Sequence, residues 1–509
     1  MIRLSLKLNR CAVLSLGAWT FLAGCSLEPH YTVPDVAASS AFKEASVITP
    51  QEAGTWEKAS PAESVPRGEW WKVFNDPQLD SYESEARAAN QNLKAAAARV
   101  EEVRAFQQTA RSQEFPSTGV GFGPARQLNS PDSLGVPPGT VIEPQNVWRA
   151  QASISYEVDL FGRVSSTVHA AKADAEQSEA LFRSVQLALE GDVAQNYFSL
   201  RELDGELDVL GKTVVLRQEA LDFVQHRFDA GDVSELDMAQ AKAELESARS
   251  DAMTLTRQRS VSEHSLAVLL GRAPAELTVK AHPIEAVTIK IPPGLPSSLL
   301  ERRPDISAAE RAMAAANARV GIARAAFFPS LMLTGIGGYE SSTLSNLFNW
   351  SSRSFLLGPL VGTPLNMPLF DGGLRKGNLA NARARYEEQV AFYRQQVLVA
   401  FREVEDSLAN VRILRDQTEV EDSAVQASAR AAQLSRTQYE DGQVNYLDVI
   451  ESERTLLQTR RAAMQLDGAQ AVSTVNLIRA LGGGWRDTPA DSAVASVAAS
   501  KNLSIAGRK

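Results

Sequence analysis

The chain has 509 residues, of which 44% are hydrophobic and 22% are charged, and its formal net charge is −9. After residue 25 no stretch offers the ~18 consecutive apolar residues that a membrane-spanning helix needs, which excludes a polytopic helical membrane protein. The acidic balance argues against a nucleic-acid-binding protein, because such proteins usually carry a basic face. Two cysteines cannot build a disulfide scaffold.

The first 25 residues have the pattern of an export signal. Three basic residues precede an apolar stretch that ends in Leu22, and the next three residues complete the sequence LAGC, which ends at Cys25. This tetrad resembles the bacterial lipobox, in which cleavage leaves the cysteine as a lipidated N-terminus. We predict a signal peptide over residues 1–24 and lipidation of Cys25, with an ordinary secretory signal as the alternative. The serine at position 26, where an aspartate would resemble an inner-membrane retention signal, favours the outer membrane.

Two long windows are free of proline. All 23 prolines lie outside Gln145–Ala273 and Leu369–Thr488, and both windows are rich in residues that favour helix. Gly231 and Gly442 lie between charged or amide neighbours and predict a reversal in each window. Each window therefore predicts an antiparallel helical hairpin, and the arm Val164–Asp229 would span about 100 Å at ~1.5 Å per residue.

The two windows are copies of each other. An offset of 211 residues places Gly231, Val233, Leu236 and Asp237 on Gly442, Val444, Leu447 and Asp448. An ARxxxFPS motif occurs upstream of each window, at Ala110 and at Ala323. The chain is therefore an internal duplication of roughly 210 residues.

Strand-like sequence lies between each FPS motif and the following helical window. Small or apolar residues alternate there with polar ones, which predicts four strands within Ser117–Phe122, Asn146–Leu160, Ser330–Tyr339 and Ser354–Phe370. We expect loops over Gly123–Gln145 and Glu340–Arg353. Four strands cannot close a barrel, and an open edge cannot face lipid. If the strands cross a membrane, several chains must share one barrel, and three chains would supply twelve strands.

These elements define a domain plan. A signal peptide (1–24) and a lipidated linker (25–65) precede the first repeat (66–271), which contains a β-hairpin at about 117–160 and a helical hairpin at about 164–271. An inter-repeat equatorial linker (272–298) leads to the second repeat (299–486), with a β-hairpin at about 330–370 and a helical hairpin at about 374–482. A flexible tail (487–509) rich in alanine and serine ends the chain.

Five motifs carry a family resemblance. They are WWxxFxDPxL from Trp70, RRPDI from Arg302, ARAAFFPS from Ala323, PLFDGG from Pro368 and ALGGGW from Ala480. In this order, on a precursor with a lipobox, they resemble the TolC-like outer-membrane efflux proteins, and most closely the OprM-type (NodT-like) lipoprotein branch that serves RND tripartite pumps. The resemblance covers almost the whole mature chain.

The resemblance implies a mainly α fold with a β-barrel portion. Three identical chains would form a twelve-stranded outer-membrane β-barrel that continues into a periplasmic α-helical barrel. This homotrimer would be the lipid-anchored exit duct through which an inner-membrane RND-type transporter and a periplasmic adaptor export drugs or other small toxic compounds. No catalytic residue, no metal site and no cofactor beyond the covalent lipid on Cys25 is expected.

The second helical reversal contains the candidate gate. Asp448 and Glu451 are three residues apart and share one helix face, so in a trimer each would form a ring of three carboxylates that attracts cations. By resemblance, Glu451 matches the position of the family's constricting aspartate, and Tyr439 matches a tyrosine that holds the closed tip by hydrogen bonding. The alternative is that both acids are solvated or favoured by the helix dipole. The first repeat has Asp237 and Gln240 at the equivalent positions.

The two reversals are also the candidate docking tips. In the family these tips meet helical hairpins of the adaptor, largely through backbone near the glycine. Two sets of four residues take this role here: Gly231, Val233, Ser234 and Leu236, and Gly442, Val444, Asn445 and Leu447. The alternative is that each glycine merely permits the turn.

Motifs of enzyme chemistry are absent from the sequence. It contains no GxxxxGKS, HExxH, GxSxG or paired CxxC motif, and its five histidines are scattered. Two other functions stay open: a duct for type I protein secretion, and a structural coiled-coil lipoprotein of the periplasm. The sequence does not name the exported compound or the cognate pump.

Overall fold

The computed structural model describes residues 26–35, 42–44, 68–137, 139–284, 303–358, 365–367 and 369–483. The predicted signal peptide, Cys25, Trp485 and the predicted tail lie outside these residues. The chain divides into two compact units. Unit 1 comprises Met1–Asp35, Ala98–Glu179 and Ala308–Gln395, and unit 2 comprises Val36–Ala97, Ala180–Ser307 and Gln396–Lys509.

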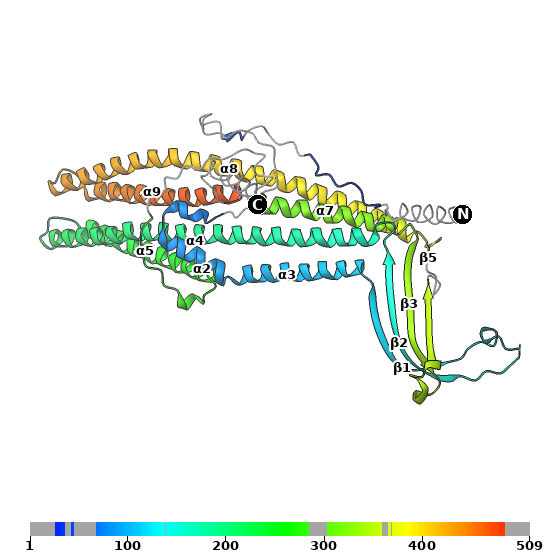
Figure 1. Ribbon diagram of the computed structural model, residues 1–509. Helices are drawn as coiled ribbons and strands as arrows, with labels where there is room; N and C mark the ends of the chain where they lie inside the picture. Colours follow the sequence, from blue (N-terminus) through cyan, green and yellow to red (C-terminus); the bar gives the residue numbers. More distant parts are fainter. Residues whose placement is uncertain are drawn as a thin grey trace, which may run out of the picture. The chain divides into compact units, whose positions relative to one another are not determined.

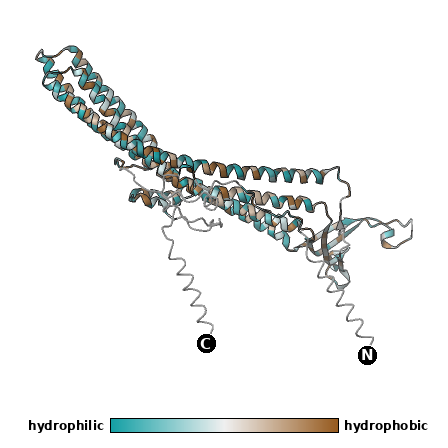
Figure 2. Ribbon diagram, turned by 90° about the horizontal axis from the view of Figure 1, so that it is seen from above, coloured by the Kyte–Doolittle hydropathy of each residue, from teal (hydrophilic) through white to brown (hydrophobic). Residues whose placement is uncertain are grey.

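Long helices dominate the described residues (Figure 1). The two predicted hairpins are confirmed as α4 (Arg163–Asp229) with α5 (Glu235–Leu269), and α8 (Leu374–Glu440) with α9 (Tyr446–Ala480). The shorter helices are α2 (Pro77–Ala89), α3 (Gln91–Arg111) and α7 (Pro304–Ala325). In Figure 2 hydrophilic and hydrophobic residues alternate along the long helices. Accordingly, none of the helices in the described ranges is both long and apolar enough to cross a membrane.

All four long helices end in the same way. The left-handed glycines that follow them are Gly231, Gly271, Gly442 and Gly482, with φ of 83°, 74°, 75° and 87°. After α4, Gly231 N–H donates to the Phe228 carbonyl at 2.9 Å, and Asp232 N–H donates to the Arg227 carbonyl at 2.8 Å. The same pair of bonds follows each of the other three helices. These bonds define Schellman motifs, which satisfy carbonyls that a helix end leaves without partners.

Unit 1 contains an antiparallel sheet with the order β1-β2-β3-β4. Its strands are β1 (Ser117–Gln127), β2 (Gln145–Val158), β3 (Ser330–Ser341), β4 (Arg353–Gly358) and the short β5 (Leu365–Asn366), which pairs with β3. The two repeats meet at β2 and β3, which pair from Trp148 with Ser341 to Val158 with Leu331. In the described part of the sheet, β1 and β4 each have a single neighbouring strand.

The prediction of a loop from Gly123 is wrong. β1 continues to Gln127, and Gly123–Gln127 pair with Arg149–Gln145. Pro124 falls within this extension and opposes Trp148. A proline has no N–H to donate, and it is found mainly in strands at the edge of a sheet, as β1 is within the single chain.

The two faces of this sheet differ in polarity. Directly opposed residues lie on one face, so the ladders place Val120, Phe122, Ile154, Leu333 and Phe355 together. Val120 is 91% exposed and Phe355 79% exposed. The other face carries polar side chains that pair across strands: Arg149 Nε donates to Glu340 Oε2 at 3.1 Å, and Gln151 Nε2 donates to Ser354 Oγ at 3.2 Å.

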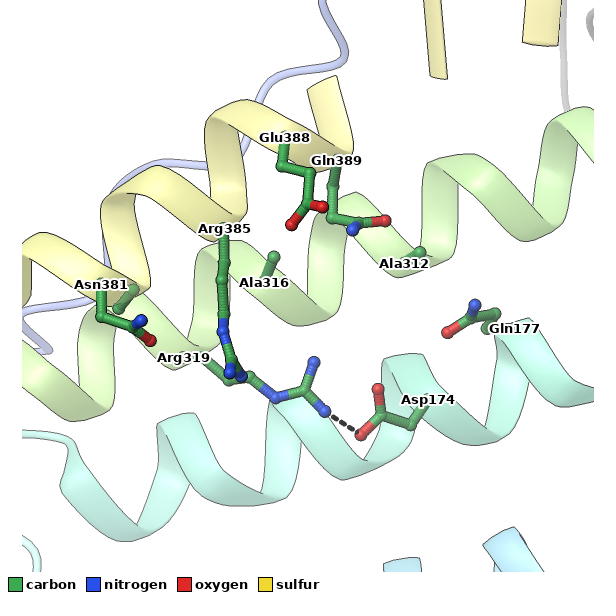
Figure 3. A pocket seen from close by; sticks show the side chains of 10 residues that line it. Asp174, Gln177, Ala312, Ala316, Arg319, Asn381, Arg385, Glu388 and Gln389 are labelled. Carbon is green, nitrogen blue, oxygen red and sulfur yellow. Dashed lines mark hydrogen bonds and ion pairs between the residues drawn. The ribbon is translucent and has the colours of Figure 1, made fainter. Parts of the chain in front are cut away.

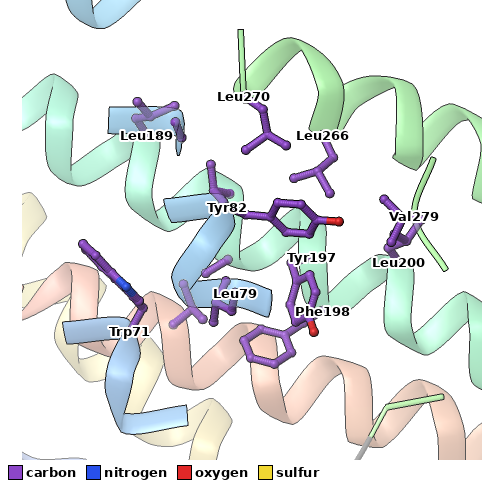
Figure 4. Packing of buried hydrophobic residues seen from close by; sticks show 14 of the residues in the cluster. Trp71, Leu79, Tyr82, Leu189, Tyr197, Phe198, Leu200, Leu266, Leu270 and Val279 are labelled. Carbon is purple, nitrogen blue, oxygen red and sulfur yellow. The ribbon is translucent and has the colours of Figure 1, made fainter. Parts of the chain in front are cut away.

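The largest core lies in unit 2 and explains the WWxxFxDPxL motif (Figure 4). Trp71 and Leu79 are completely buried there. Asp76 caps α2 by accepting from the backbone N–H groups of Gln78 at 2.8 Å and Leu79 at 3.2 Å, and it also accepts from the Tyr197 hydroxyl. Such caps satisfy amide groups that the first helical turn leaves without partners. The motif therefore builds the core that joins α2 to α4.

The RRPDI motif has a structural role in the same unit. Arg303 forms a bidentate pair with Asp305, at 3.1 and 2.6 Å, and donates to the Ala480 carbonyl at 2.9 Å. Its guanidinium also lies 2.7 Å from Glu403. Burial alone would raise the pKa of Asp305, but hydrogen bonds from Arg303, Ile306 and Gln396 outweigh it and lower that pKa. One buried arginine thus connects the start of α7 to α8 and α9.

Glu83 is an exception within the buried core of unit 2. It is completely buried, and neither of its carboxyl oxygens has a hydrogen-bond partner among the described residues. Burial, assisted by the negative charge of Glu190, raises its pKa to about 10. Glu83 is therefore a neutral acid at physiological pH.

Candidate gate and docking tips

The two reversals have the same local structure. Each joins a Schellman motif to a capping box, in which the third helical residue accepts a hydrogen bond from the backbone of the residue that caps the helix. Asp237 accepts from Ser234 N–H at 3.1 Å, and Asp448 accepts from Asn445 N–H at 3.1 Å. These bonds fix the entry of α5 and α9.

Side-chain exposure at the tips agrees with a docking role. Leu236 is 64% exposed and Leu447 is 49% exposed. A side chain added at Gly231 or Gly442 would meet no heavy atom within 4 Å, so the backbone there is open. Val233 and Val444 are only partly buried and pack at the edge of a hydrophobic cluster. The docking role itself stays a prediction.

A hydrophobic cluster joins the two tips within unit 2. We call it the tip cluster, and its buried members are Val224, Ala241, Tyr439, Tyr446, Val449 and Ile450. Two members come from the first hairpin and four from the second. The tip of the second hairpin is therefore packed against that of the first.

Tyr439 belongs to this cluster. Its ring centroid lies 5.3 Å from that of Tyr446, and the Arg227 guanidinium lies 5.5 Å from the ring centroid. Burial raises the Tyr439 pKa, and the positive charge of Arg227 partly offsets this. The hydroxyl has no partner with good hydrogen-bond geometry among the described residues. Its predicted bond at a closed tip stays a prediction.

The two acidic gate candidates are exposed in the single chain. Asp448 and Glu451 lie one turn apart on α9, on the side away from the buried Val449 and Ile450. Asp448 also belongs to the capping box, so its structural role is separate from any gating role. Among the described residues, the Glu451 carboxylate has no hydrogen-bond partner. No structural role of this kind therefore explains the acid at this position.

The sequence did not point to an ionic cluster above the tips. Glu244 of α5 pairs with Arg217 of α4 at 3.0 Å and with Arg454 of α9. The side chains of Arg217 and Glu244 are 8% and 10% exposed. Seven residues further along α9, Arg461 pairs with Glu206 at 2.8 Å. Alternating charge on a helix is usually a solvated face, so the sequence pattern alone does not indicate that these five residues pair.

A separate polar hollow lies between α4, α7 and α8 of unit 1 (Figure 3). It measures about 610 Å³, and Arg319 Nη2 donates to Asp174 Oδ2 across it at 2.6 Å. The residues that line it come from three distant segments, so no local sequence pattern indicates it. Its polar lining suits water or an ion better than a drug-sized apolar ligand.

A family model provides the decisive comparison. The model described as "Outer membrane efflux protein" matches residues 83–272 and again 295–483. The chain belongs to the outer membrane efflux protein family.

Relatives and solved structures agree with this assignment. The chain is 32% identical over 483 residues to the cation efflux system protein CusC of Escherichia coli O6:H1, covering 94% of this chain and 100% of the relative. It is 33% identical over 476 residues to the toluene efflux pump outer membrane protein TtgF of Pseudomonas putida, covering 93% and 96%. The open state of the Neisseria gonorrhoeae MtrE outer membrane channel matches with a TM-score of 0.76 and 29% identity, covering 90% and 98%.

The fold is accordingly that of an outer-membrane efflux channel. Membership of this family of channels also agrees with the absence of enzyme motifs from the sequence.

Proposed function

We propose that three copies of this chain form the outer-membrane exit duct of a tripartite efflux pump. The duct would receive drugs or other small toxic compounds from an inner-membrane RND-type transporter and a periplasmic adaptor. The observation that carries this proposal is the sheet of unit 1, which is apolar and exposed on one face and polar on the other. This is the pattern of strands that face lipid on one side and a water-filled lumen on the other.

The edges of the sheet support the trimer. In lipid each unsatisfied backbone N–H or C=O costs several kcal/mol, so β1 and β4 need further strands beside them. Pairing β1 of one chain with β4 of the next would close three sheets into one barrel of twelve strands. The long helical hairpins would then form the periplasmic part of the duct.

The lipid anchor is a second part of the proposal. Cys25 follows the sequence LAG, and acylation there would hold the chain on the outer membrane. Mass spectrometry of the N-terminal peptide of the purified protein tests this. An unmodified N-terminus at another residue would contradict it.

Single-channel recording in planar bilayers tests the duct. The purified full-length protein should give discrete conductance steps, at least in variants that open the tip. A complete lack of conductance, in the wild type and in all tip variants, would favour a structural lipoprotein. The exposed apolar face of the sheet argues against that alternative, because a protein surrounded by water in the periplasm would leave this face unburied. A type I secretion duct would share the conductance, and co-purification with an ABC-type exporter would identify it.

Replacing Gly442 with valine is expected to weaken adaptor capture while the trimer persists. The glycine has φ of 75° and open space around it, so valine adds backbone strain and bulk at the tip surface. Cross-linking to the adaptor and native mass spectrometry of the duct measure the two effects. Gly377→Val is the matched control, because Gly377 is an exposed glycine of α8. Loss of the trimer in Gly442→Val would instead indicate that the glycine serves folding alone.

A further inference from the structure

Residues 26–35 lie along the helices of unit 1 as an extended segment, which we call the N-terminal strap. It contains Pro29 and Pro34 and has no helix or strand. A segment without regular structure is held in place only by its contacts with other elements, because it makes few hydrogen bonds of its own. The contacts of the strap therefore decide what it does.

Two glycines let the strap approach the helices closely. A Cβ atom at Gly162, just before α4, would come within 3.1 Å of Ser26 Cα. A Cβ atom at Gly321 of α7 would come within 2.8 Å of Ser166 Oγ of α4 and within 3.0 Å of Glu28 Cα. These distances are too short for an ordinary contact, so a larger residue at either glycine would displace the strap, and at Gly321 it would also crowd α4.

Polar contacts follow in order along the strap. Glu28 Oε2 lies 2.9 Å from His169 Nδ1 of α4, and the Pro29 carbonyl accepts from Asn317 Nδ2 of α7 at 2.8 Å. The Tyr31 hydroxyl donates a hydrogen bond to Glu310, which precedes Asn317 on α7 by nearly two helical turns. Thr32 and Pro34 then line a hollow against α8, together with Tyr386, Val390 and Arg394.

We propose that this groove of α4 and α7, rather than the acyl chains, fixes where the lipid-bearing residue leaves the protein. Ser26 packs against Gly162, which lies four residues after the end of β2 at Val158. One peptide bond joins Ser26 to Cys25. The strap therefore starts beside the end of β2, where we infer that the lipid-bearing residue leaves the protein. If the strap were not docked, its ten residues at ~3.4 Å each would allow the position of the lipid-bearing residue to vary by about 30 Å.

The functional consequence rests on the proposed lipidation of Cys25, whereas the docking does not. Acyl chains presented at the end of the sheet can enter the bilayer without any rearrangement of the protein. The strap is thus a built-in spacer that sets the height of the anchor relative to the strands. Docking should persist in a chain that carries no lipid.

A nitroxide label on His30→Cys reports on docking in the full-length protein. His30 is an exposed strap residue between Pro29 and Tyr31. In a Cys11→Ser, Cys25→Ser background this label occupies the only cysteine of the chain, whether or not the predicted signal peptide is removed. We expect a motionally restricted spectrum with and without the lipid.

Two variants should release the strap. Gly321→Leu fills the groove, and Tyr31→Ala removes the contact with Glu310 without altering any helix. Both should make the label mobile, with a correlation time several-fold shorter, while the trimer remains intact. Gly377→Leu adds a leucine to α8 where no heavy atom lies within 4 Å, and it should leave the spectrum restricted. Because Gly321 is buried and also faces Ser166 of α4, Tyr31→Ala is the variant that tests the strap without crowding a helix.

Two results would overturn the proposal. A mobile label in the Cys11→Ser, Cys25→Ser background alone would mean that the lipid, and not the groove, holds the strap. A restricted label in both Gly321→Leu and Tyr31→Ala would mean that the observed contacts do not hold it. Neither result depends on conductance, so a failure of the proposed duct would be seen separately.

Discussion

Replacing Glu83 with glutamine is expected to stabilise the protein at neutral pH by on the order of 3 kcal/mol, because each unit of pKa shift corresponds to about 1.4 kcal/mol. The carboxyl is completely buried, and burial raises its pKa to about 10. At pH 7 the folded chain therefore holds a proton that the unfolded chain, with an ordinary glutamate pKa near 4.5, has lost. Glutamine never ionises, so the variant avoids this cost.

The sign of the pH dependence follows from the raised pKa. The stability contributed by neutral Glu83 is fully present below the unfolded pKa, and it is lost progressively as the pH rises towards about 10. Wild type and variant should therefore unfold at similar temperatures at pH 4 and diverge from pH 5 upwards. Thermal unfolding of the detergent-solubilised protein across this range measures the difference.

Glu102→Gln serves as the control for this experiment. Glu102 is exposed on α3, so its replacement should leave the melting temperature and its pH dependence nearly unchanged. Equal behaviour of Glu83→Gln and wild type from pH 5 to pH 9 would contradict the neutral state of Glu83.

Removing the acidic pair of the second tip is expected to increase conductance severalfold and to reduce cation selectivity. In a trimer Asp448→Ala with Glu451→Ala removes six carboxylates from one exposed face of α9. Shorter side chains widen the passage, and the loss of negative charge removes the attraction for cations. Planar-bilayer recording with salt gradients measures both effects.

The capping role of Asp448 requires a matched control. Asp448→Ala also removes a capping-box acceptor, a loss worth ~1 kcal/mol at the start of α9. Asp237→Ala removes the same bond from α5 in the first hairpin, where position 240 is a glutamine. If Asp237→Ala raises conductance as much as the pair does, loosening of the tip explains the effect. If Glu451→Ala alone leaves conductance and selectivity unchanged, the gate assignment fails.

The long helices could be predicted because their signals are local. Absence of proline, helix-favouring composition and a glycine at each reversal placed the start of α4 within one residue. Leu245, Ala248, Ala252 and Leu255 have the 3-4-3 spacing that predicts helix–helix packing, and three of them are buried whereas Ala252 is only partly buried. The extent of β1 was harder, because Pro124 reads as a loop residue unless its neighbouring strand is known.

The remaining features depend on contacts between distant segments. Glu244 resembles a solvated helix residue in the sequence, and only the fold places it beside Arg217 and Arg454. Asp448 was predicted as a gate residue from its spacing to Glu451, yet its bond to Asn445 required the turn geometry. Glu83 gave no signal, since burial of an acid cannot be read from one helix alone.

The twin capping boxes have an evolutionary consequence. Asp237 and Asp448 perform one backbone task in both halves of the chain, whereas the position three residues later has become Gln240 in one half and Glu451 in the other. Selection could thus change charge at one tip while an unaltered duplicate continued to support the fold. Comparison of the two halves of one chain therefore shows where the two tips differ in charge while sharing the same capping bond.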